Sequence, residues 1–250
     1  MEAKPIEAEC FPSNELRPVP EVNKSGPPQK VSRTKPLIPA AGYHWLTRYY
    51  DTGVHWIMRE TAFKKQLVRQ LGLQPDHKLL DLGCGTGTLL AMLAGQCPKA
   101  HFVGIDGDPK VLALAKTKTD HLGARIDLRQ ALATSLPFAD GVFDRVVTTL
   151  VFHHLRREEK AAALSEALRV LKPGGQFFLA DLEVPQNALM YLAFFVVRFY
   201  DGFETTRDNG NGQLPVLAEQ AGFAHWTRTA RFATPVGTLG IFQAVKPVGP

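Results

Sequence analysis

Short apolar runs alternate along the chain with longer segments in which apolar residues recur every three or four positions. A short apolar run predicts a buried strand, and the longer spacing predicts an amphipathic helix. The first strand is predicted to begin at Lys78. Further strands are predicted at 101–106, 125–129, 142–150 and 176–180, and near the end at 224–232 and 238–245. Helices are predicted at 63–71, 109–122, 158–171 and 214–221. Strands and helices that alternate in this way indicate an α/β fold with a mostly parallel sheet.

The first 38 residues do not share this pattern. They contain seven prolines among mostly polar side chains. A segment of that composition buries too little apolar area to offset the entropy that it loses on ordering. Residues 1–38 are therefore predicted to be a disordered tail, and residues 39–250 a single domain.

The composition is that of an ordinary globular protein. The chain has 250 residues, of which 45% are hydrophobic, and a formal net charge of +5; this mild excess does not favour nucleic acid as a partner. Cys10, Cys84 and Cys97 lack the spacing of a zinc site or a disulfide framework, so no metal and a cytoplasmic location are predicted. The chain starts without an apolar signal segment, and its apolar run at 188–197 is too short to span a bilayer, which leaves peripheral membrane contact open.

Three glycines at alternate positions, Gly83, Gly85 and Gly87, separate the first apolar run from a helical pattern. This arrangement predicts a strand, a tight turn and a helix whose first amides are free to bind a ligand. Glycine suits such a turn because a Cβ would block close approach of the ligand and because some turn positions require a positive φ.

Two aspartates indicate which ligand the turn receives. Asp106 ends the next strand, about 20 residues after the glycines, where a carboxylate accepts hydrogen bonds from ribose hydroxyls. Asp81 precedes Gly83 by two residues, and its charge would repel a pyrophosphate but attract an ammonium or sulfonium group. In the dinucleotide fingerprint the third glycine stands where this chain has Thr88. Electrostatics therefore favours S-adenosylmethionine over NAD, with an NAD-dependent oxidoreductase as the alternative.

Further motifs follow in a fixed order, and together they resemble a known family. They are Asp81–Gly87, Gly104–Pro109, Leu136–Phe138, Phe143–Asp144, Phe152–Leu155 and Leu168–Gly175. Over residues 43–246 the chain resembles class I S-adenosylmethionine-dependent methyltransferases, and within them the ubiquinone/menaquinone-biosynthesis C-methyltransferase-like branch. The resemblance implies a Rossmann-like, doubly wound, mostly parallel seven-stranded sheet with helices on both faces, and S-adenosylmethionine as the cofactor.

The resemblance also implies a set of cofactor-binding residues. In the family an N-terminal helix with a Tyr-Asp pair folds over the cofactor, and Tyr50-Asp51 stands in that place, with Arg59 nearby. Family members commonly have an Asp for the adenine amino group where this chain has Leu132, so apolar packing and a backbone amide near Ala133 are expected instead. The full predicted set is Tyr50, Arg59, Asp81, Gly83, Cys84, Gly85, Thr86, Gly87, Asp106, Gly107, Leu132, Ala133 and Leu150. For Cys84, a small residue that packs in the turn is favoured over a nucleophile.

Three residues near the ends of the fourth and fifth strands are candidates for catalysis. His153 and His154 follow the fourth strand and Asp181 ends the fifth, at the edge of the sheet where ligands bind in open α/β folds. A neutral imidazole or a carboxylate there accepts a proton if the methyl acceptor has to lose one. The alternatives are histidines that satisfy backbone groups and an aspartate that caps a helix.

The segment 188–200 is apolar around most of a helix, so protein, ligand or membrane must cover it. In the resembled family the insert after the fifth strand, here 184–212, often forms part of the acceptor site. A small or lipid-like, hydrophobic acceptor is therefore expected, and core packing or a dimer interface is the alternative. A module that binds S-adenosylmethionine without catalysis remains a further alternative. Nucleic-acid methylation is not favoured because Thr148–Phe152 replaces the Asp/Asn-Pro-Pro-aromatic motif.

Overall fold

The computed structural model of the protein describes residues 60–122 and 125–249. The predicted tail, residues 1–38, lies outside the described residues, as do the aromatic residues between positions 43 and 56. The domain boundary predicted at residue 39 therefore remains a proposal.

Seven strands form one sheet in the order β3-β2-β1-β4-β5-β7-β6. Their bounds are β1 Lys78–Leu82, β2 His101–Asp106, β3 Arg125–Gln130, β4 Phe143–Thr149, β5 Leu171–Glu183, β6 Ala224–Thr234 and β7 Gly237–Val245. β1 to β5 pair in parallel, whereas β7 is antiparallel to both β5 and β6. The expected seven-stranded, mostly parallel sheet is confirmed. The strand order reverses between β1 and β4, which is where a ligand crevice opens in such folds.

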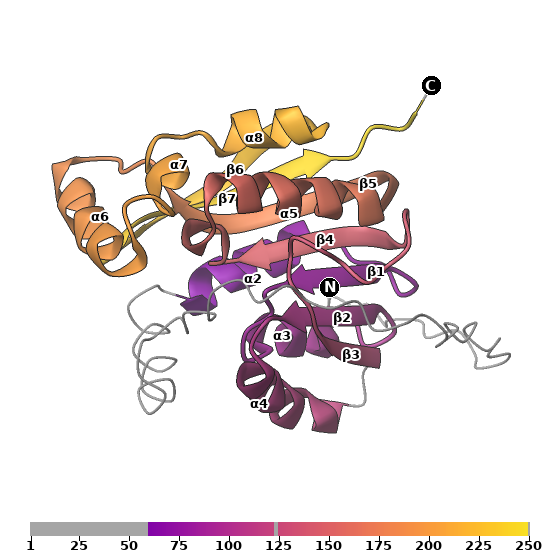
Figure 1. The fold of residues 1–250 in the computed structure, drawn as a ribbon. Helices are drawn as coiled ribbons and strands as arrows, with labels where there is room; N and C mark the ends of the chain where they lie inside the picture. The colour runs from indigo at the N-terminus through magenta and orange to yellow at the C-terminus, as the bar shows by residue number, and fades with distance from the viewer. Residues whose placement is uncertain (1–59, 123–124, 250) are drawn as a thin grey trace, which may run out of the picture. The chain divides into compact units, whose positions relative to one another are not determined.

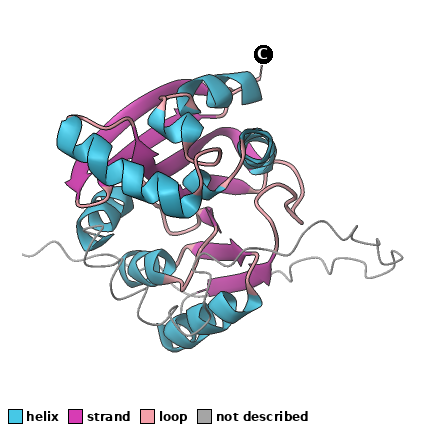
Figure 2. Cartoon of the chain, turned by 60° about the vertical axis from the view of Figure 1, so that its left-hand side comes forward, coloured by secondary structure: helices cyan, strands magenta, loops and turns pink. Residues whose placement is uncertain are grey.

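Helices cover both faces of this sheet, as the two views of the chain show (Figures 1 and 2). Their bounds are α2 Glu60–Gln70, α3 Thr88–Gln96, α4 Pro109–Thr119, η1 Asp120–Leu122, η2 Phe152–His154, α5 Arg157–Val170, α6 Ala188–Asp201, α7 Arg207–Gly210 and α8 Leu214–Ala221. Asp108 caps α4 by accepting a hydrogen bond from the Lys110 amide, and Pro109 occupies the first turn, where its missing N–H costs nothing.

Alternate residues of the central strands β1, β4 and β5 enter two separate apolar cores. Leu79 of β1 packs in the core that α2 and α3 cover, and Leu80 packs in the core under α5 and α8. Both are fully buried, and burying a leucine side chain stabilises the fold by about 1.5–3 kcal/mol. Because the period of a strand is two residues, Asp81 points to the same face as Leu79.

Two elements differ from the expectation because tertiary contacts extend them. A cluster of Asp, Asn and Gly residues such as that at 208–212 is typical of a turn, but its first residues belong to α7, where Asp208 forms ion pairs with the half-exposed Arg157 (2.5 Å) and the buried Lys160 (3.7 Å) of α5. The fifth strand was expected at 176–180, but β5 runs from Leu171, which pairs with Phe143 of β4, to Glu183, because β7 pairs with it from Gln176 to Glu183.

Candidate functional site

The glycine turn joins β1 to α3, and all three of its glycines have a left-handed backbone. Their φ angles are +71° for Gly83, +54° for Gly85 and +74° for Gly87. The turn is closed by hydrogen bonds from the Cys84 amide to the Ile105 carbonyl (2.8 Å) and from the Gly87 amide to the Cys84 carbonyl (3.0 Å). Residues with a Cβ adopt this conformation at a cost of roughly 1–2 kcal/mol, so the backbone alone favours glycine at each position.

The three glycines differ in what a side chain would meet. A Cβ on Gly83 would lie 2.4 Å from Cγ2 of Val151, and one on Gly87 would lie 3.1 Å from the Cβ of Ala115. No atom of the described residues would lie within 4 Å of a Cβ on Gly85. Gly83 and Gly87 are thus required by the packing of the protein itself. Gly85 borders open space, where a ligand can approach the backbone closely.

Asp81 is a buried carboxylate for which the described residues supply no hydrogen bond. The residue is 1% exposed, and neither of its side-chain oxygens has a hydrogen-bond partner. Burial raises the pKa of Asp81 from 3.8 to about 7, and the charge of Lys64 only partly opposes this shift. A buried polar group without a partner costs folding free energy, so its retention fits a ligand that donates hydrogen bonds and carries positive charge.

Asp106, at the end of β2, faces the glycine turn. One of its oxygens accepts a hydrogen bond from the Gly85 amide and the other accepts one from the Asp108 amide, both at 3.0 Å. A carboxylate has about four acceptor sites, so each oxygen still has capacity for a ligand hydroxyl. Gly107, the next residue, presents its carbonyl to the side-chain amide of Gln130 at 3.1 Å.

The start of α3 completes this part of the site. Within residues 60–122 and 125–249 no side chain caps the helix, so its first amides are available to a ligand. Lys118 of α4 donates to the hydroxyls of Thr86 and Thr88, each at 2.8 Å, and so fixes the turn to the neighbouring helix.

The other residues predicted to bind the cofactor have varied surroundings. Leu132 is 52% exposed and bridges to Ser135, and Ala133 beside it is half-buried. Leu150 is half-buried with a φ of +58°, which strains a leucine and often marks a functional site. Cys84 is buried with its sulfur close to Gly104, and burial raises the pKa of the thiol, as expected for a packing role. Tyr50 and Arg59 lie outside the described residues.

The two histidines and Asp181 form a buried network at the ends of β4 and β5. Nδ1 of His153, in η2, lies 2.7 Å from Oδ1 of Asp181. The Leu182 amide (2.7 Å) and the side-chain amide of Asn209 (3.3 Å) donate to the same oxygen. The Phe152 amide donates to the other oxygen at 2.7 Å. Asp181 is fully buried, as Asp81 is, but the described residues supply hydrogen-bond partners to both of its oxygens.

The charges in this network shift the pKa values of its members. Burial alone would lower the pKa of His153, but the Asp181 carboxylate outweighs it and raises that pKa. Burial alone would raise the pKa of Asp181. The charge and hydrogen bond of His153, together with the hydrogen bonds of two backbone amides, outweigh burial and lower that pKa. Burial and the neighbouring His153 lower the pKa of His154 to about 3.

Two residues of the network were not predicted from the sequence. Asp201, the last residue of α6, places one oxygen 3.8 Å from Nε2 of His153 and the other 3.9 Å from Nδ1 of His154. Asn209 of α7 contacts Asp181 from a segment expected to be a turn. The only sequence signal for Asp201 is an acid that directly follows a long apolar helix.

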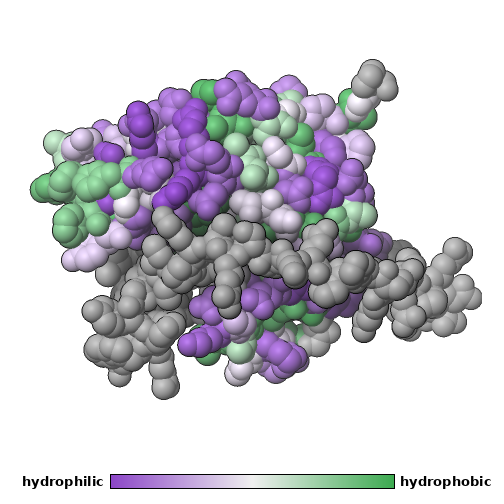
Figure 3. Space-filling view, in the orientation of Figure 1, coloured by the Kyte–Doolittle hydropathy of each residue, from purple (hydrophilic) through white to green (hydrophobic). Residues whose placement is uncertain are grey.

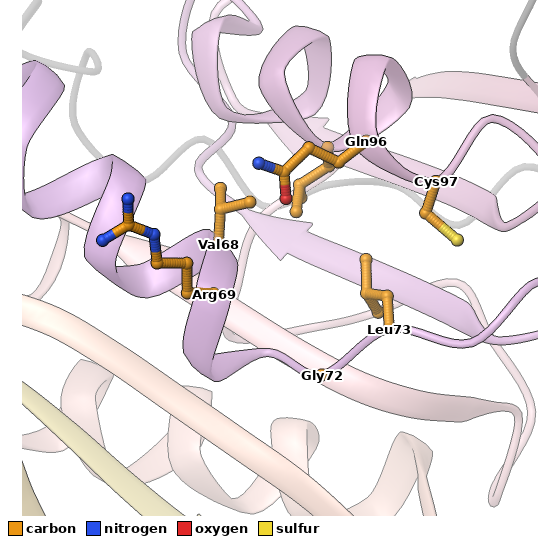
Figure 4. Close-up of a pocket in the computed structure, with 7 residues that line it drawn as sticks. Val68, Arg69, Gly72, Leu73, Gln96 and Cys97 are labelled. Carbon is orange, nitrogen blue, oxygen red and sulfur yellow. The ribbon is translucent and has the colours of Figure 1, made fainter. Parts of the chain in front are cut away.

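A pocket of about 240 Å³ lies elsewhere, between the ends of α2 and α3 (Figure 4). It is lined by Val68, Arg69, Gly72, Leu73, Leu93, Gln96 and Cys97. These residues are at the end of α3 opposite to the glycine turn, so this pocket is separate from the site described above.

Comparison with known proteins identifies the family. Residues 79–175 match the family model of a methyltransferase domain. An uncharacterized methyltransferase of Synechocystis sp. is 36% identical over 74% of this chain and 83% of its own length. A demethylmenaquinone methyltransferase of Thermus thermophilus is 38% identical over 72% of this chain and 81% of its own. The chain belongs to the class I S-adenosylmethionine-dependent methyltransferases.

Solved structures agree with this methyltransferase fold. A chain from the Haloferax volcanii complex of the Trm112 activator with a methyltransferase superposes with a TM-score of 0.65 at 20% identity, over 81% of this chain and 96% of its own. An S-adenosylmethionine-dependent methyltransferase of Methanosarcina mazei gives a TM-score of 0.58 at 25% identity, over 71% of this chain and 95% of its own.

Membership of this family makes S-adenosylmethionine the methyl donor, so the NAD-dependent alternative is set aside. When bound, S-adenosylmethionine supplies an electrophilic methyl group on a sulfonium. The unpartnered carboxylate of Asp81 and the open space beside Gly85 fit such a cationic nucleoside. In the described part of the methyltransferase, no helix is both long enough and apolar enough to cross a membrane.

Proposed function

We propose that this methyltransferase acts on a hydrophobic, lipid-like acceptor of the quinone type. The observation that carries the proposal is the surface of α6. Among its apolar side chains only Phe194 is buried, whereas Leu192 is 64%, Phe199 70% and Tyr200 81% exposed. In the space-filling view, hydrophobic residues gather over this helix (Figure 3).

The position of α6 supports this proposal. The helix ends at Asp201, whose carboxylate lies within 4 Å of His153 and His154. An apolar molecule that covers α6 can therefore extend one end to the carboxyl edge of the sheet, where the methyl donor binds. Each 100 Å² of apolar surface that it covers contributes about 2.5 kcal/mol to binding.

The names of several relatives point in the same direction. Relatives from Thermus thermophilus and Chlorobaculum parvum, at 38% and 33% identity, are named demethylmenaquinone methyltransferases. The acceptor of those proteins is a lipid-like quinone precursor, and the exposed α6 is compatible with an acceptor of that kind here.

We assign roles on the cofactor side as follows. Gly83 to Gly87 and Asp81 hold the methionyl part and Asp106 holds the ribose hydroxyls. Leu132 and Ala133 pack beside the adenine. Leu150 lines the passage to the acceptor, and Tyr50 and Arg59, which lie outside the described residues, are assigned to the methionine end of the donor.

On the acceptor side, we assign His153 and His154 of η2 to face the acceptor, and the buried Asp181 of β5 to act through His153. Methyl transfer mainly requires that acceptor, methyl carbon and sulfur lie in line and that water is excluded. A group on the acceptor side has to accept a proton only if the acceptor loses one, as a hydroquinone carbon or hydroxyl does.

Transfer of a radiolabelled methyl group from S-adenosylmethionine tests the proposal. The acceptor panel consists of a short-chain demethylmenaquinol, a simple catechol and a small polar amine. We expect turnover on the quinol and at least tenfold less on the other two. Preferred turnover on the polar amine would contradict the proposal, and cofactor binding without transfer to any acceptor would favour the non-catalytic module.

A pair of variants connects turnover to α6. Phe199→Ser should lower turnover on the quinol and leave the stability within about 0.5 kcal/mol, because the side chain is exposed. Val216→Ser, at a 40% exposed position of α8 on the other side of the sheet, is the matched control and should change neither quantity. Equal turnover of the quinol by both variants would show that the acceptor does not bind on α6.

A further inference from the structure

Three side chains from two elements converge on one point at the carboxyl edge of the sheet. They are His153 and His154 of η2 and Asp201 at the end of α6. One ligand atom from each lies within 4.8 Å of the other two, and no other such group of three occurs in the described residues. We propose that these three residues bind a divalent transition-metal cation such as Zn²⁺.

The distances between the Asp201 oxygens and the ring nitrogens of the two histidines suit a shared cation better than direct hydrogen bonds. The carboxylate oxygens of Asp201 are 3.8 Å from Nε2 of His153 and 3.9 Å from Nδ1 of His154, beyond hydrogen-bond range. Around a tetrahedral Zn²⁺, with bonds of about 2.1 Å, neighbouring ligand atoms lie about 3.4 Å apart. The three ligand atoms lie within 4.8 Å of one another, so rotation of the side chains that shortens these separations to about 3.4 Å would close the site on an ion. The side chains of His154 and Asp201 are 33% and 19% exposed, which leaves them room to move.

A second observation concerns the orientation of His153. Its Nδ1 is bound to the buried carboxylate of Asp181, so its Nε2 faces Asp201. Two backbone amides and Asn209 in turn hold Asp181 in place. A metal-binding histidine characteristically donates its other ring nitrogen to such a carboxylate, which fixes the ring and strengthens the ligand. Asp181 thus has the position of the outer carboxylate of a carboxylate–histidine–metal arrangement.

The ligand set indicates the class of cation and its use. Two imidazoles and one carboxylate favour Zn²⁺, Fe²⁺, Co²⁺ or Ni²⁺ over Mg²⁺ and Ca²⁺, which prefer oxygen ligands. Three protein ligands leave at least one coordination position for another molecule. If the acceptor of the proposed function carries a hydroxyl group, a cation there would bind its oxygen and lower its pKa, and the proton would pass to solvent water. The sequence does not suggest this site because Asp201 is 47 residues distant from His154 in the chain and has no motif around it.

The test measures metal binding by the full chain in the absence of S-adenosylmethionine and acceptor. Zn²⁺ is titrated against a chromophoric chelator, and bound Co²⁺ is followed by its visible absorption. We expect one equivalent of Zn²⁺ to bind with a dissociation constant in the micromolar range or below. The same Zn²⁺ should displace bound Co²⁺, so that the visible absorption of Co²⁺ is lost. Because no methyl donor is present, a negative result overturns the metal site and leaves the proposed methyl transfer untouched.

Variants locate the ion. Asp201→Asn and His154→Gln should weaken Zn²⁺ binding at least tenfold, and Asp181→Asn should weaken it by about 10–100-fold through the orientation of His153. The matched controls His121→Gln and Asp127→Asn, at exposed positions outside the cluster, should bind as the wild type does. Unchanged Zn²⁺ binding by Asp201→Asn and His154→Gln would overturn the proposal. So would failure of the wild type to bind one equivalent of Zn²⁺ when the Zn²⁺ concentration is 100 times that of the protein.

A crystal grown with Zn²⁺ provides a measurement that needs no variant. The anomalous scattering of zinc should show a peak between the two imidazoles and the carboxylate. A peak at the cysteines or on the surface alone would contradict the site.

Discussion

Asp81 on β1 and Asp181 on β5 are both almost completely buried, yet their surroundings are opposite. Asp81 has no hydrogen-bond partner among the described residues, whereas Asp181 accepts hydrogen bonds from two backbone amides, a histidine and an asparagine. Because an unpaired buried charge costs several kcal/mol, a fold retains one only where a ligand supplies the missing partner. The cofactor half of the site, built on β1 to β3, is thus shaped to receive charge. In the acceptor half, from β4 to α7, the buried polar side chains form hydrogen bonds with one another and with the backbone.

The same isosteric substitution at the two positions should give the largest contrast in stability. Asp181→Asn leaves at least one buried donor without an acceptor and His153 without its counter-ion, so we expect a loss of about 3–5 kcal/mol in the free energy of unfolding. Asp81→Asn removes an unpaired buried charge, so the protein without cofactor should be equally or more stable. Urea denaturation of both variants measures the difference. Equal losses at both positions would mean that Asp81 has a partner in the folded chain.

The two halves also differ in how far the sequence predicts them. Most of the cofactor half lies in two short segments, 81–87 and 104–109, so spacing alone predicts the turn, the helix after it and the approach of Asp106 to Gly85. The acceptor half takes its members from β4, β5, α6 and α7. Asp201 matters only because α6 ends beside η2, and Asn209 only because ion pairs of Asp208 hold α7 against α5. Such contacts depend on tertiary packing and have no local signal.

The helix predicted at 188–200 illustrates the same limit. Its extent is nearly that of α6, Ala188–Asp201, because an apolar run of that length after an Asn cap strongly favours a helix. What covers its apolar surface cannot be deduced from the run itself, since protein, ligand and membrane would all require the same residues.

The glycine turn allows a contrast within the cofactor half. Gly83→Ala places a Cβ against Val151 at a positive φ, so we expect a loss of about 2–4 kcal/mol in stability. Gly85→Ala meets no neighbour in the described part of the chain and should lose only about 1–2 kcal/mol for its φ. It should nevertheless weaken S-adenosylmethionine binding, because its methyl group enters the space proposed for the cofactor. Thermal denaturation and calorimetric titration separate the two effects. Undiminished cofactor binding by Gly85→Ala would place the ligand away from this glycine.

The affinity for S-adenosylmethionine should depend on pH through Asp81. The pKa of this carboxyl is raised from 3.8 to about 7, so its charged form, which attracts the cationic donor, is lost as the pH falls through 7. Asp81→Asn should weaken binding by about 1.5–3 kcal/mol, the usual value for hydrogen bonds to a charged group, and should remove the pH dependence. Calorimetric titration between pH 6 and about 8.5, the range that brackets this raised pKa, tests this.

The stability of the protein without cofactor should change with pH in the opposite direction. Since the folded-state pKa of Asp81 is the higher one, its contribution to stability is fully present below pH 3.8 and is lost as the pH rises through about 7. The difference in unfolding free energy between wild type and Asp81→Asn isolates this contribution from other titrating groups. A difference that does not vary with pH would show that Asp81 titrates normally.

The smallest expected effect concerns Leu132, where the cofactor half departs from the pattern of its family. Leu132→Asp introduces the carboxylate that family members commonly use for the adenine amino group, and one added hydrogen bond is worth about 0.5–1.5 kcal/mol. We therefore expect S-adenosylmethionine to bind about two- to tenfold more tightly, with little change in stability because Leu132 is 52% exposed. Leu189→Asp, at a 68% exposed position of α6, is the control for the added charge and should leave the affinity unchanged. Weaker binding by Leu132→Asp alone would show that apolar packing by Leu132 is how this methyltransferase holds the adenine, and that the cofactor half is adapted to its own leucine.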